Sequence, residues 1–155
     1  MIRDLLEKYI QKTKNKDFKF DDSLSTLVLW SFFISKLISM LRGLKFFYFS
    51  QRGKVVLCGR QVQAFNKNNI YFGNNVDLGD YVKLSALGTG HLNIGHSVNI
   101  GAFSRIIISS SFNNLGKYIK IGDNVGIGEF AHIGGAGGVE IGKDTIIGQY
   151  FSTHP

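Results

Sequence analysis

Apolar residues recur at two different periods along the chain, and the change of period divides it into two parts. In the first part, the apolar residues between Leu5 and Ile10 recur at helical spacing among charged ones, which predicts a short amphipathic helix. A polar, lysine-rich connection follows over 12–20. The residues Asp21 to Ser23 are then the expected cap of a second helix over 24–44.

The second predicted helix is apolar around most of its circumference. Its polar side chains fall about four residues apart and form one narrow stripe, which consists of Ser31, Ser35, Ser39 and Arg42. The uncharged run 23–35 has 13 residues, whereas a bilayer core requires about 20, so a full membrane span is not favoured.

Basic and aromatic residues alternate after this helix. The basic ones are Arg42, Lys45, Arg52, Lys54 and Arg60, and the aromatic ones are Phe46, Phe47, Tyr48 and Phe49. Two interpretations of residues 24–54 stay open. They pack on the protein itself or on a sister subunit, or they make peripheral contact with an anionic membrane surface.

In the second part, a ten-residue pattern returns four times from residue 70 onward. In each copy an Ile, Leu or Phe precedes a Gly, and a second such pair follows six residues later. The glycines of the four copies are Gly73 and Gly79, Gly95 and Gly101, Gly122 and Gly128, and Gly142 and Gly148. A period of six is typical of hexapeptide β-helices, in which short strands joined by tight turns stack coil on coil. The sequence therefore predicts a mainly β protein with a parallel β-helix.

Each position of the hexad has an expected place in the coil. The aliphatic residue before the glycine points inward, and a second inward site follows four residues later at Val76, Val82, Val98, Val125 and Thr145. The glycines, together with Asn75, Asp80 and Asn124, suit tight corners, where a bulky side chain would collide or φ turns positive. Gly134 to Gly138 is expected to be a turn rather than a nucleotide-binding loop.

The spacing between copies predicts where insertions leave the β-helix. The first core residues of successive copies are 22, 27 and 20 residues apart, against about 18 for three hexads. The residues beyond 18 come after the start of the third hexad in each copy, so all three insertions are expected to leave the same corner. Insertions on one edge usually mark the binding face of a solenoid. The longest includes Ser109 to Asn114, which is polar enough to line a cleft.

Composition and charge agree with two parts. The chain has 155 residues with 44% apolar residues, enough for one core, and this argues against disorder and a multidomain enzyme. Residues 1–60 hold 12 Lys and Arg against 5 Asp and Glu, and 61–155 hold six of each, so the net charge of +7 lies in the first part. The basic residues accompany an apolar helix rather than a groove-fitting motif, so no nucleic acid is expected. We expect an N-terminal helical segment over 1–54 and a β-helix over 55–155.

These repeats resemble the hexapeptide-repeat acyltransferases, specifically the O-acetyltransferases of polysaccharide and capsule synthesis and, more distantly, the maltose and galactoside acetyltransferases. The resemblance implies a left-handed parallel β-helix and a homotrimer with acetyl-CoA bound between neighbouring subunits. It also implies O-acetylation of a cell-surface saccharide or its precursor, and a cytoplasmic location at the inner face of the cell membrane. In the family a histidine is the general base that takes the proton of the acceptor hydroxyl.

The segment Ser152-Thr153-His154-Pro155 is similar to the Thr-His-Pro of the sugar acetyltransferases, so His154 is the candidate base. Tyr150, Phe151 and Ser152 beside it are candidates for contact with substrate or cofactor. The family spacing places the base about four residues further along. The alternative is therefore that the catalytic segment lies past Pro155, and that the β-helix over 55–155 is an incomplete, non-catalytic module for trimerisation or ligand binding.

The remaining candidates have plainer interpretations. His91 and His96 have a spacing similar to part of the zinc site of γ-class carbonic anhydrases, but the obvious third ligand, His132, has no confirming motif, so no metal is expected. Trp30 is expected in a core or an interface. Cys58, the single cysteine, excludes a disulfide framework and is expected to be a buried, inert thiol.

Overall fold

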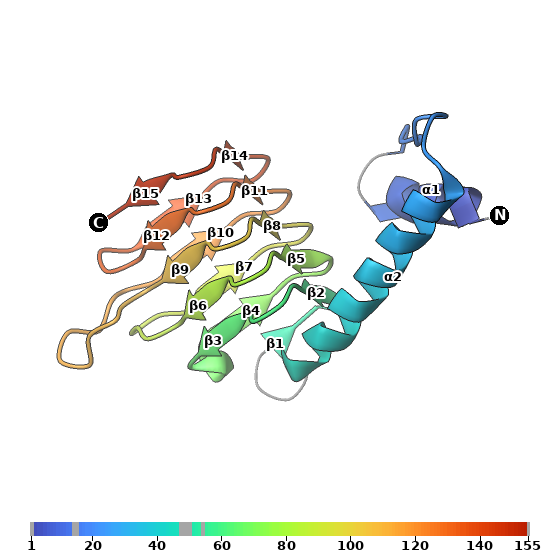
Figure 1. Cartoon of the computed structure of the whole chain (residues 1–155). Helices are drawn as coiled ribbons and strands as arrows, with labels where there is room; N and C mark the ends of the chain where they lie inside the picture. The colour runs from blue at the N-terminus through green and yellow to red at the C-terminus, as the bar shows by residue number, and fades with distance from the viewer. Residues whose placement is uncertain (1, 14–15, 47–50, 54, 155) are drawn as a thin grey trace.

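The computed structural model describes residues 2–13, 16–46, 51–53 and 55–154, and it consists of two helices followed by a parallel β-helix (Figure 1). Helix α1 spans Ile2–Thr13 and helix α2 spans Thr26–Gly43, and a 3-10 turn over Leu44–Phe46 leads into the first strand. The β-helix confirms the fold class predicted from the six-residue period.

The β-helix has three faces, and each face is a five-stranded parallel sheet. Sheet A contains β1 (Gln51–Arg52), β4 (Ile70–Phe72), β7 (Leu92–Ile94), β10 (Ile119–Ile121) and β13 (Val139–Ile141). Sheet B contains β2 (Val56–Cys58), β5 (Val76–Leu78), β8 (Asn99–Ile100), β11 (Gly126–Ile127) and β14 (Ile146–Ile147). Sheet C contains β3 (Gln63–Phe65), β6 (Lys83–Ser85), β9 (Arg105–Ile107), β12 (His132–Gly134) and β15 (Ser152–Thr153). Strand β1 already pairs with β4, so the β-helix of the structure includes residues before 55.

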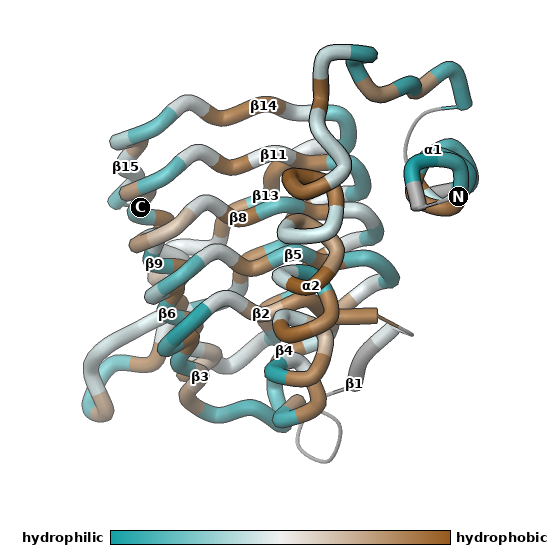
Figure 2. Tube along the Cα trace, turned by 45° about the vertical axis from the view of Figure 1, so that its right-hand side comes forward, coloured by the Kyte–Doolittle hydropathy of each residue, from teal (hydrophilic) through white to brown (hydrophobic). Residues whose placement is uncertain are grey.

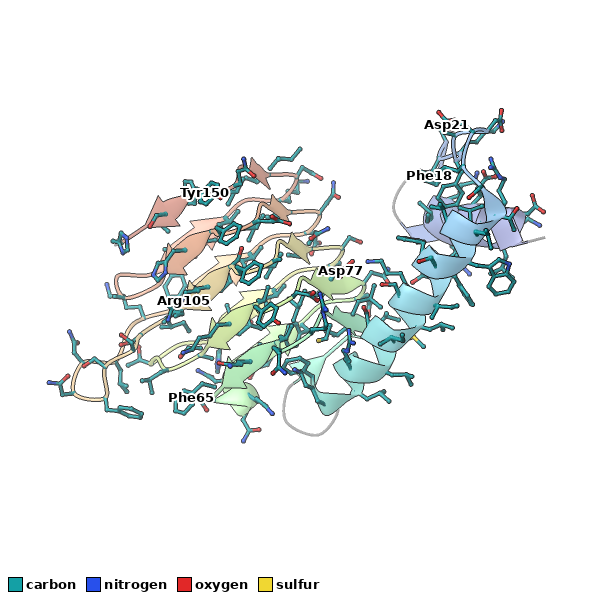
Figure 3. The ribbon with its side chains drawn as sticks, in the orientation of Figure 1. Phe18, Asp21, Phe65, Asp77, Arg105 and Tyr150 are labelled. Atoms are coloured by element: carbon teal, nitrogen blue, oxygen red, sulfur yellow. The ribbon has the colours of Figure 1, made fainter. Side chains whose placement is uncertain are left out.

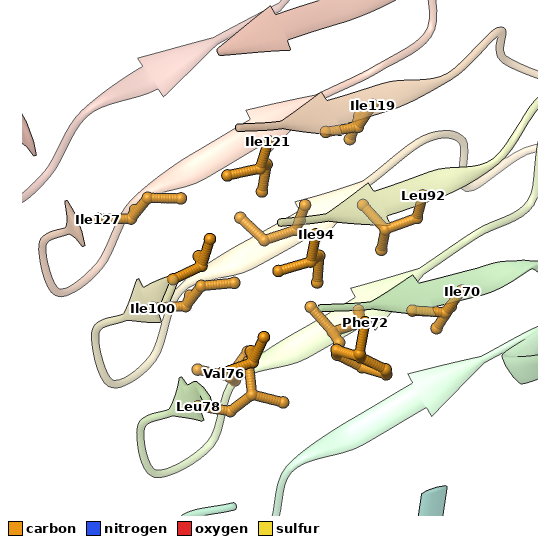
Figure 4. Close-up of a cluster of buried hydrophobic side chains, with 14 of the residues drawn as sticks. Ile70, Phe72, Val76, Leu78, Leu92, Ile94, Ile100, Ile119, Ile121 and Ile127 are labelled. Atoms are coloured by element: carbon orange, nitrogen blue, oxygen red, sulfur yellow. The ribbon is translucent and has the colours of Figure 1, made fainter. Parts of the chain in front are cut away.

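The core of the prism is a set of vertical stacks of aliphatic side chains (Figure 4). The residues before the repeat glycines are buried from Phe72 to Ile127, and in the last copy Ile141 and Ile147 are partly buried. The second inward site is buried at Val76, Val82 and Val98. Stacking identical positions of successive coils explains why the inward residues are almost all Ile, Leu or Val, the residues that fill a pleated interior.

The repeat glycines of the first three copies are required by the approach of the next coil rather than by their own φ. A Cβ on Gly101 would lie 2.5 Å from the backbone nitrogen of Glu129, and one on Gly73 would lie 2.5 Å from the carbonyl carbon of Gly95. Of the described glycines only Gly138 has a positive φ, of 94°, in the Gly134 to Gly138 turn. The expectation of collision is therefore confirmed, and the expectation of positive φ at the repeat glycines is wrong.

Positive φ falls instead on non-glycine residues two positions after each repeat glycine. At the corner between sheets A and B these residues are Asn75, Ser97, Asn124 and Asp144, and at the corner between sheets B and C they are Gln61, Tyr81, Phe103, Phe130 and Tyr150. The prediction for Asn75 and Asn124 is confirmed. Asp80 lies at a corner without positive φ, and its carboxylate accepts from the backbone N–H of Arg60 at 2.6 Å.

Helix α1 organises the connection that leads to α2. Its Arg3 donates to the backbone carbonyls of Asp21 and Leu24, and its Glu7 accepts from the backbone N–H of Phe20. Helix α2 is capped by Ser25, whose side chain accepts from the N–H of Val28. The predicted cap at 21–23 is wrong because Asp21 instead closes a tight turn on Ser23.

Helix α2 docks on sheet B by one face only. Gly43 allows the close approach, since a Cβ there would lie 1.9 Å from the carbonyl oxygen of Val56. Leu29, near the other end of α2, is also buried. Lys36 forms an ion pair with Asp77 of β5. On the opposite side of the helix a row of large apolar side chains is exposed, namely Leu27, Trp30, Ile34, Leu37, Ile38 and Leu41. Figure 2 shows that α2 is hydrophobic along much of its length.

Three described residues of the basic and aromatic segment after α2, namely Lys45, Phe46 and Arg60, contact the β-helix. Phe46 is fully buried against Phe72, with ring centroids 5.1 Å apart, so for this residue the interpretation of packing on the protein itself is the correct one. Lys45 donates to the carbonyl of Val62, and Arg60 pairs with Asp80. Phe47, Tyr48, Phe49 and Lys54 lie outside the described residues.

The insertions leave one corner of the prism, as predicted. All connections between sheet C and the next strand of sheet A occur there: 66–69, 86–91, 108–118 and 135–138. The loops rest on one another, with a parallel bridge between Gly88 and Gly116 and a hydrogen bond from the N–H of Gly90 to the carbonyl of Lys117. The longest loop, 108–118, is therefore held beside sheet C by backbone contacts with the preceding loop.

Candidate functional site on the outer face of sheet C

The outer face of sheet C carries a column of polar side chains, one on each coil. The strand register aligns Gln63 with Lys83, Lys83 with Arg105, Arg105 with His132, and His132 with Ser152. Each of these residues immediately precedes an inward core residue, so the alternation of the strand turns it outward. The face thus presents two cations and an imidazole on successive coils.

His154 lies at the upper end of this column, next to His132. Their rings are stacked with centroids 5.2 Å apart, and the Ser152 hydroxyl is 2.9 Å from Nε2 of His154. The pKa of His132 is lowered because the ring is partly desolvated and because His154 and Arg105 are close to it. A lowered pKa favours the neutral imidazole, which can accept a proton. The structure therefore brings two of the predicted site residues, His154 and Ser152, together with His132.

Tyr150 belongs to an aromatic ladder on the corner between sheets B and C. Its ring stacks on Phe130, which stacks on Phe103, which stacks on Tyr81, with centroid separations of 5.1, 5.0 and 5.0 Å and interplanar angles below 10°. The rings stay substantially exposed. Tyr150 and Phe151 thus lie along the edge of the same face as His154, and their contact with a substrate stays a prediction.

A groove lies lower on sheet C, between the column and the longest insertion. Its volume is about 410 Å³, and Lys83, Arg105, Phe65 and Phe112 contribute to its lining together with Ser109 and Ser110. Phe112 reaches back from the loop to Phe65, with ring centroids 6.1 Å apart in an edge-to-face arrangement. The expectation that 109–114 lines a cleft is confirmed. Figure 3 shows Phe65, Arg105 and Tyr150 at successive heights of this side of the prism.

The other candidates lie in structural contacts. His91 contacts Asn69 and the ring of Tyr71, and His96 accepts from the backbone N–H of Asn74 at 2.9 Å. Over the described part of the chain, no three His, Cys, Asp or Glu side chains come together as a metal site would require. Cys58 is fully buried, and burial raises the pKa of its thiol to about 11, which confirms the expectation of an inert thiol. Trp30 is nearly half exposed on α2.

Sequence reasoning missed Lys83 and Arg105 and gave His132 no catalytic role. One signal was available, because all three directly precede a core residue of the third hexad and so must face outward on the same sheet. The three are separated by 22 and 27 residues, so no constant period connects them. Their alignment appears only when the insertions are placed.

Comparison with known proteins gives a likeness of fold. No family model matches the chain, and no curated protein matches it. Among solved structures, serine acetyltransferase isoform 3 from Entamoeba histolytica, in complex with cysteine, is 24% identical with a TM-score of 0.47. The match covers 69% of this chain and 34% of that chain, so this chain spans about a third of the length of that protein.

Proposed function

We propose that the protein is an acetyl-CoA-dependent O-acetyltransferase that acts on a hydroxyl of a cell-surface saccharide or its precursor, with His154 as the general base. The observation that carries the proposal is the stacked pair His132 and His154 on the outer face of sheet C, above an open groove. A base must lie within hydrogen-bond reach of the proton that it takes. Nε2 of His154 already lies 2.9 Å from a hydroxyl, that of Ser152.

The transfer follows from this arrangement. The acceptor hydroxyl takes the place of the Ser152 hydroxyl at His154, and its oxygen attacks the thioester carbonyl carbon while its proton passes to the imidazole. The tetrahedral adduct then collapses, the carbon–sulfur bond breaks, and CoA leaves as a thiol with the proton of the imidazolium. The lowered pKa of His132 beneath the base favours its neutral form, which adds no positive charge beside His154.

Release of free thiol from acetyl-CoA with a panel of saccharides tests the proposal. His154→Gln is expected to lower kcat by about 100-fold or more, because general-base catalysis contributes 10²–10⁴, and to leave KM for acetyl-CoA within about twofold. His96→Gln, on the corner between sheets A and B, is the matched control and should keep full activity. A folded protein without turnover on any saccharide would favour the alternative, a non-catalytic β-helix module.

The proposal includes a homotrimer with acetyl-CoA between neighbouring subunits. Exposed aromatic side chains flank the sheet C face on both sides, with Phe112 on the loop and Phe151 at the opposite corner. A neighbouring copy that covers them would close the open side of the groove and exclude water from it. Sedimentation equilibrium should give three times the chain mass of 17.2 kDa, and a monomer at all concentrations would contradict this part.

The proposal also places the protein at the inner face of the cell membrane. Thr26–Phe46 is, within the described residues, long and apolar enough to cross a membrane. Helix α2 is nevertheless held along sheet B by Gly43 and by the Lys36–Asp77 pair. We therefore favour peripheral contact, in which the exposed apolar row of α2 enters the headgroup boundary and nearby basic residues face anionic lipid.

Co-sedimentation with vesicles tests this membrane contact. The double variant Leu37→Ser/Leu41→Ser removes two large side chains from the exposed row and should lower the bound fraction on phosphatidylglycerol vesicles severalfold. Leu115→Ser removes an equally exposed leucine from the loop beside sheet C and is the control. Equal loss in both variants would contradict contact through α2.

A further inference from the structure

Two cations of the sheet C column face each other without an acidic partner. Lys83 and Arg105 occupy paired positions of neighbouring strands, which lie about 4.8 Å apart. Like charges directly opposite each other on a sheet are destabilising. Within the described residues, the carboxylates that form ion pairs do so with other cations, and none pairs with Lys83 or Arg105.

Elsewhere on the prism, ion pairs connect neighbouring coils. On sheet A, Lys120 pairs with Glu140 of the next coil at 2.9 Å. At the corner between sheets B and C, Arg60 pairs with Asp80 of the next coil, also at 2.9 Å. In both pairs the carboxylate lies on the next coil, at the position equivalent to that of Arg105 relative to Lys83. The sheet C column therefore lacks an anion that its own chain supplies elsewhere.

Lys83 and Arg105 lie in a groove rather than on an open surface. Both side chains line the groove of about 410 Å³, within the usual range of small-molecule sites. Phe65 and Phe112 supply an aromatic wall, and Ser109 and Ser110 line the groove on the loop side. The loop is anchored, because the buried Ser85 hydroxyl donates to the carbonyl of Ser109 and the Ser109 hydroxyl donates to that of Asn114.

We propose that this groove binds the acidic group of a saccharide, so that the acceptor of the proposed transfer is an acidic sugar rather than a neutral one. The Arg105 guanidinium matches a carboxylate or a phosphate with two parallel hydrogen bonds, and Lys83 adds a point charge one coil below. The aromatic wall suits the apolar face of a sugar ring, and hydroxyls and the Gln63 amide suit its polar edge. The inference rests on the proposed function only in naming the bound sugar as the acceptor.

Isothermal titration of the whole chain without acetyl-CoA tests the binding by itself. The probes are glucuronate, glucose 1-phosphate and, as the uncharged match, glucose. Glucuronate or glucose 1-phosphate should bind at least tenfold more tightly than glucose, and the affinity should fall as salt is raised. The two charged probes distinguish a carboxylate from a phosphate as the preferred group.

Variants locate the binding. Lys83→Gln and Arg105→Gln should each weaken binding of the charged sugar by about fivefold or more, because each removes one charge–charge contact. Lys120→Gln on sheet A is the matched control and should change the affinity by less than twofold. Equal affinity for glucose and the charged sugars, or no loss in either groove variant, would overturn the inference.

Two further outcomes separate this inference from its alternatives. If CoA displaces glucuronate, and if the two groove variants weaken the binding of CoA but not that of glucuronate, the groove is a CoA phosphate site and the inference is wrong. If the thiol-release assay shows turnover on neutral sugars only, the acetyltransferase stands and the acidic acceptor does not. Tight binding of glucuronate by a chain without turnover keeps the acid-sugar site and removes the enzyme.

Discussion

Two corners of the β-helix use the same backbone and different side chains. At both corners a residue with φ between 51° and 60° follows two positions after a glycine, and in most coils its N–H donates to the coil below. Between sheets A and B that residue is Asn, Ser or Asp, which tolerate left-handed φ at small cost. Between sheets B and C it is an aromatic residue in four of five coils, which is costly for one residue alone.

The difference shows two ways of stabilising one backbone conformation. A small polar side chain such as Asn or Asp tolerates left-handed φ at small cost by itself, and Asn124 in addition donates to Asp144 of the next coil at 2.8 Å. An aromatic side chain is compensated by its neighbours on other coils, through parallel stacking worth about 0.5–1.5 kcal/mol a pair. The first corner therefore depends less on neighbouring coils, and the second depends on the stack to offset the cost of its φ values.

The largest effect should come from a feature that both corners share. Gly101→Ala and Gly95→Ala place a Cβ within about 2.7 Å of the next coil, and each should destabilise the protein by about 3 kcal/mol or prevent folding. Gly126→Ala is the control, because no atom lies within 4 Å of its Cβ position. Urea unfolding measures all three. A tolerated Gly101→Ala would show that the coils can move apart.

Removing the central ring of the aromatic ladder should destabilise the protein more than a substitution at the polar corner. Phe103→Ala loses stacking with both Tyr81 and Phe130 and should cost about 2 kcal/mol. Asn124→Ala at the polar corner should cost about 1 kcal/mol, for one hydrogen bond and a left-handed alanine. Urea unfolding of both variants gives the two values. Equal costs would mean that the aromatic stack adds nothing beyond the local turn.

The end of the ladder should matter less than its centre. Tyr150 stacks on one neighbour, Phe130, so Tyr150→Ala should cost about 1 kcal/mol, half the cost of Phe103→Ala. Thermal unfolding of the pair of variants compares them. A larger loss for Tyr150→Ala than for Phe103→Ala would contradict stabilisation by stacking.

Glycine at the left-handed position should be tolerated better at the polar corner than at the aromatic corner. Asn124→Gly removes the cost of left-handed φ along with one hydrogen bond, and the two effects should nearly cancel, within about 0.5 kcal/mol. Phe103→Gly removes the same strain but still loses two stacked pairs, so it should remain destabilised by about 1–2 kcal/mol. Differential scanning calorimetry compares them, and full recovery in Phe103→Gly would contradict the ladder.

The smallest effect should be a dependence on pH at the lowest step of the B–C corner, where Gln61 replaces an aromatic residue and Arg60 pairs with Asp80. The backbone N–H and the side chain of Arg60 lower the pKa of Asp80 below its usual value of 3.8. A lowered folded-state pKa stabilises the folded protein above the unfolded value, and this is lost as the pH falls through the folded value. Asp80→Asn should therefore lower Tm slightly at pH 7 and not at pH 2. The same shift at both pH values would exclude an ionic contribution.

The sequence predicted the β-helix and the common corner of its insertions because both depend on a short, regular period. The corner conformation was predicted correctly for Asn75 and Asn124 and wrongly for the repeat glycines, since those of the first three copies are required by the next coil and not by their own φ. The place of Phe46 stayed open between the protein core and a membrane surface, because an aromatic run beside basic residues has the same sequence pattern in both cases. Only the tertiary contact with Phe72 distinguishes the two.

The candidate site was predicted in part. His154 and Ser152 were found by their local motif, and their partner His132 was not, because it lies one coil below and 22 residues earlier in the chain. Lys83 and Arg105 became visible when the strand register aligned them. Local motifs therefore identified single residues, and the stacking of coils identified the surface.

The shared corner of the insertions also affects how such a protein can change over generations. Loops of different length leave sheet C and rejoin sheet A between the same two strand ends. A gain or loss of a few codons at this place leaves the register of every strand unaltered. Selection can therefore reshape the wall of the groove, and with it ligand preference, while the folding of the scaffold is inherited intact.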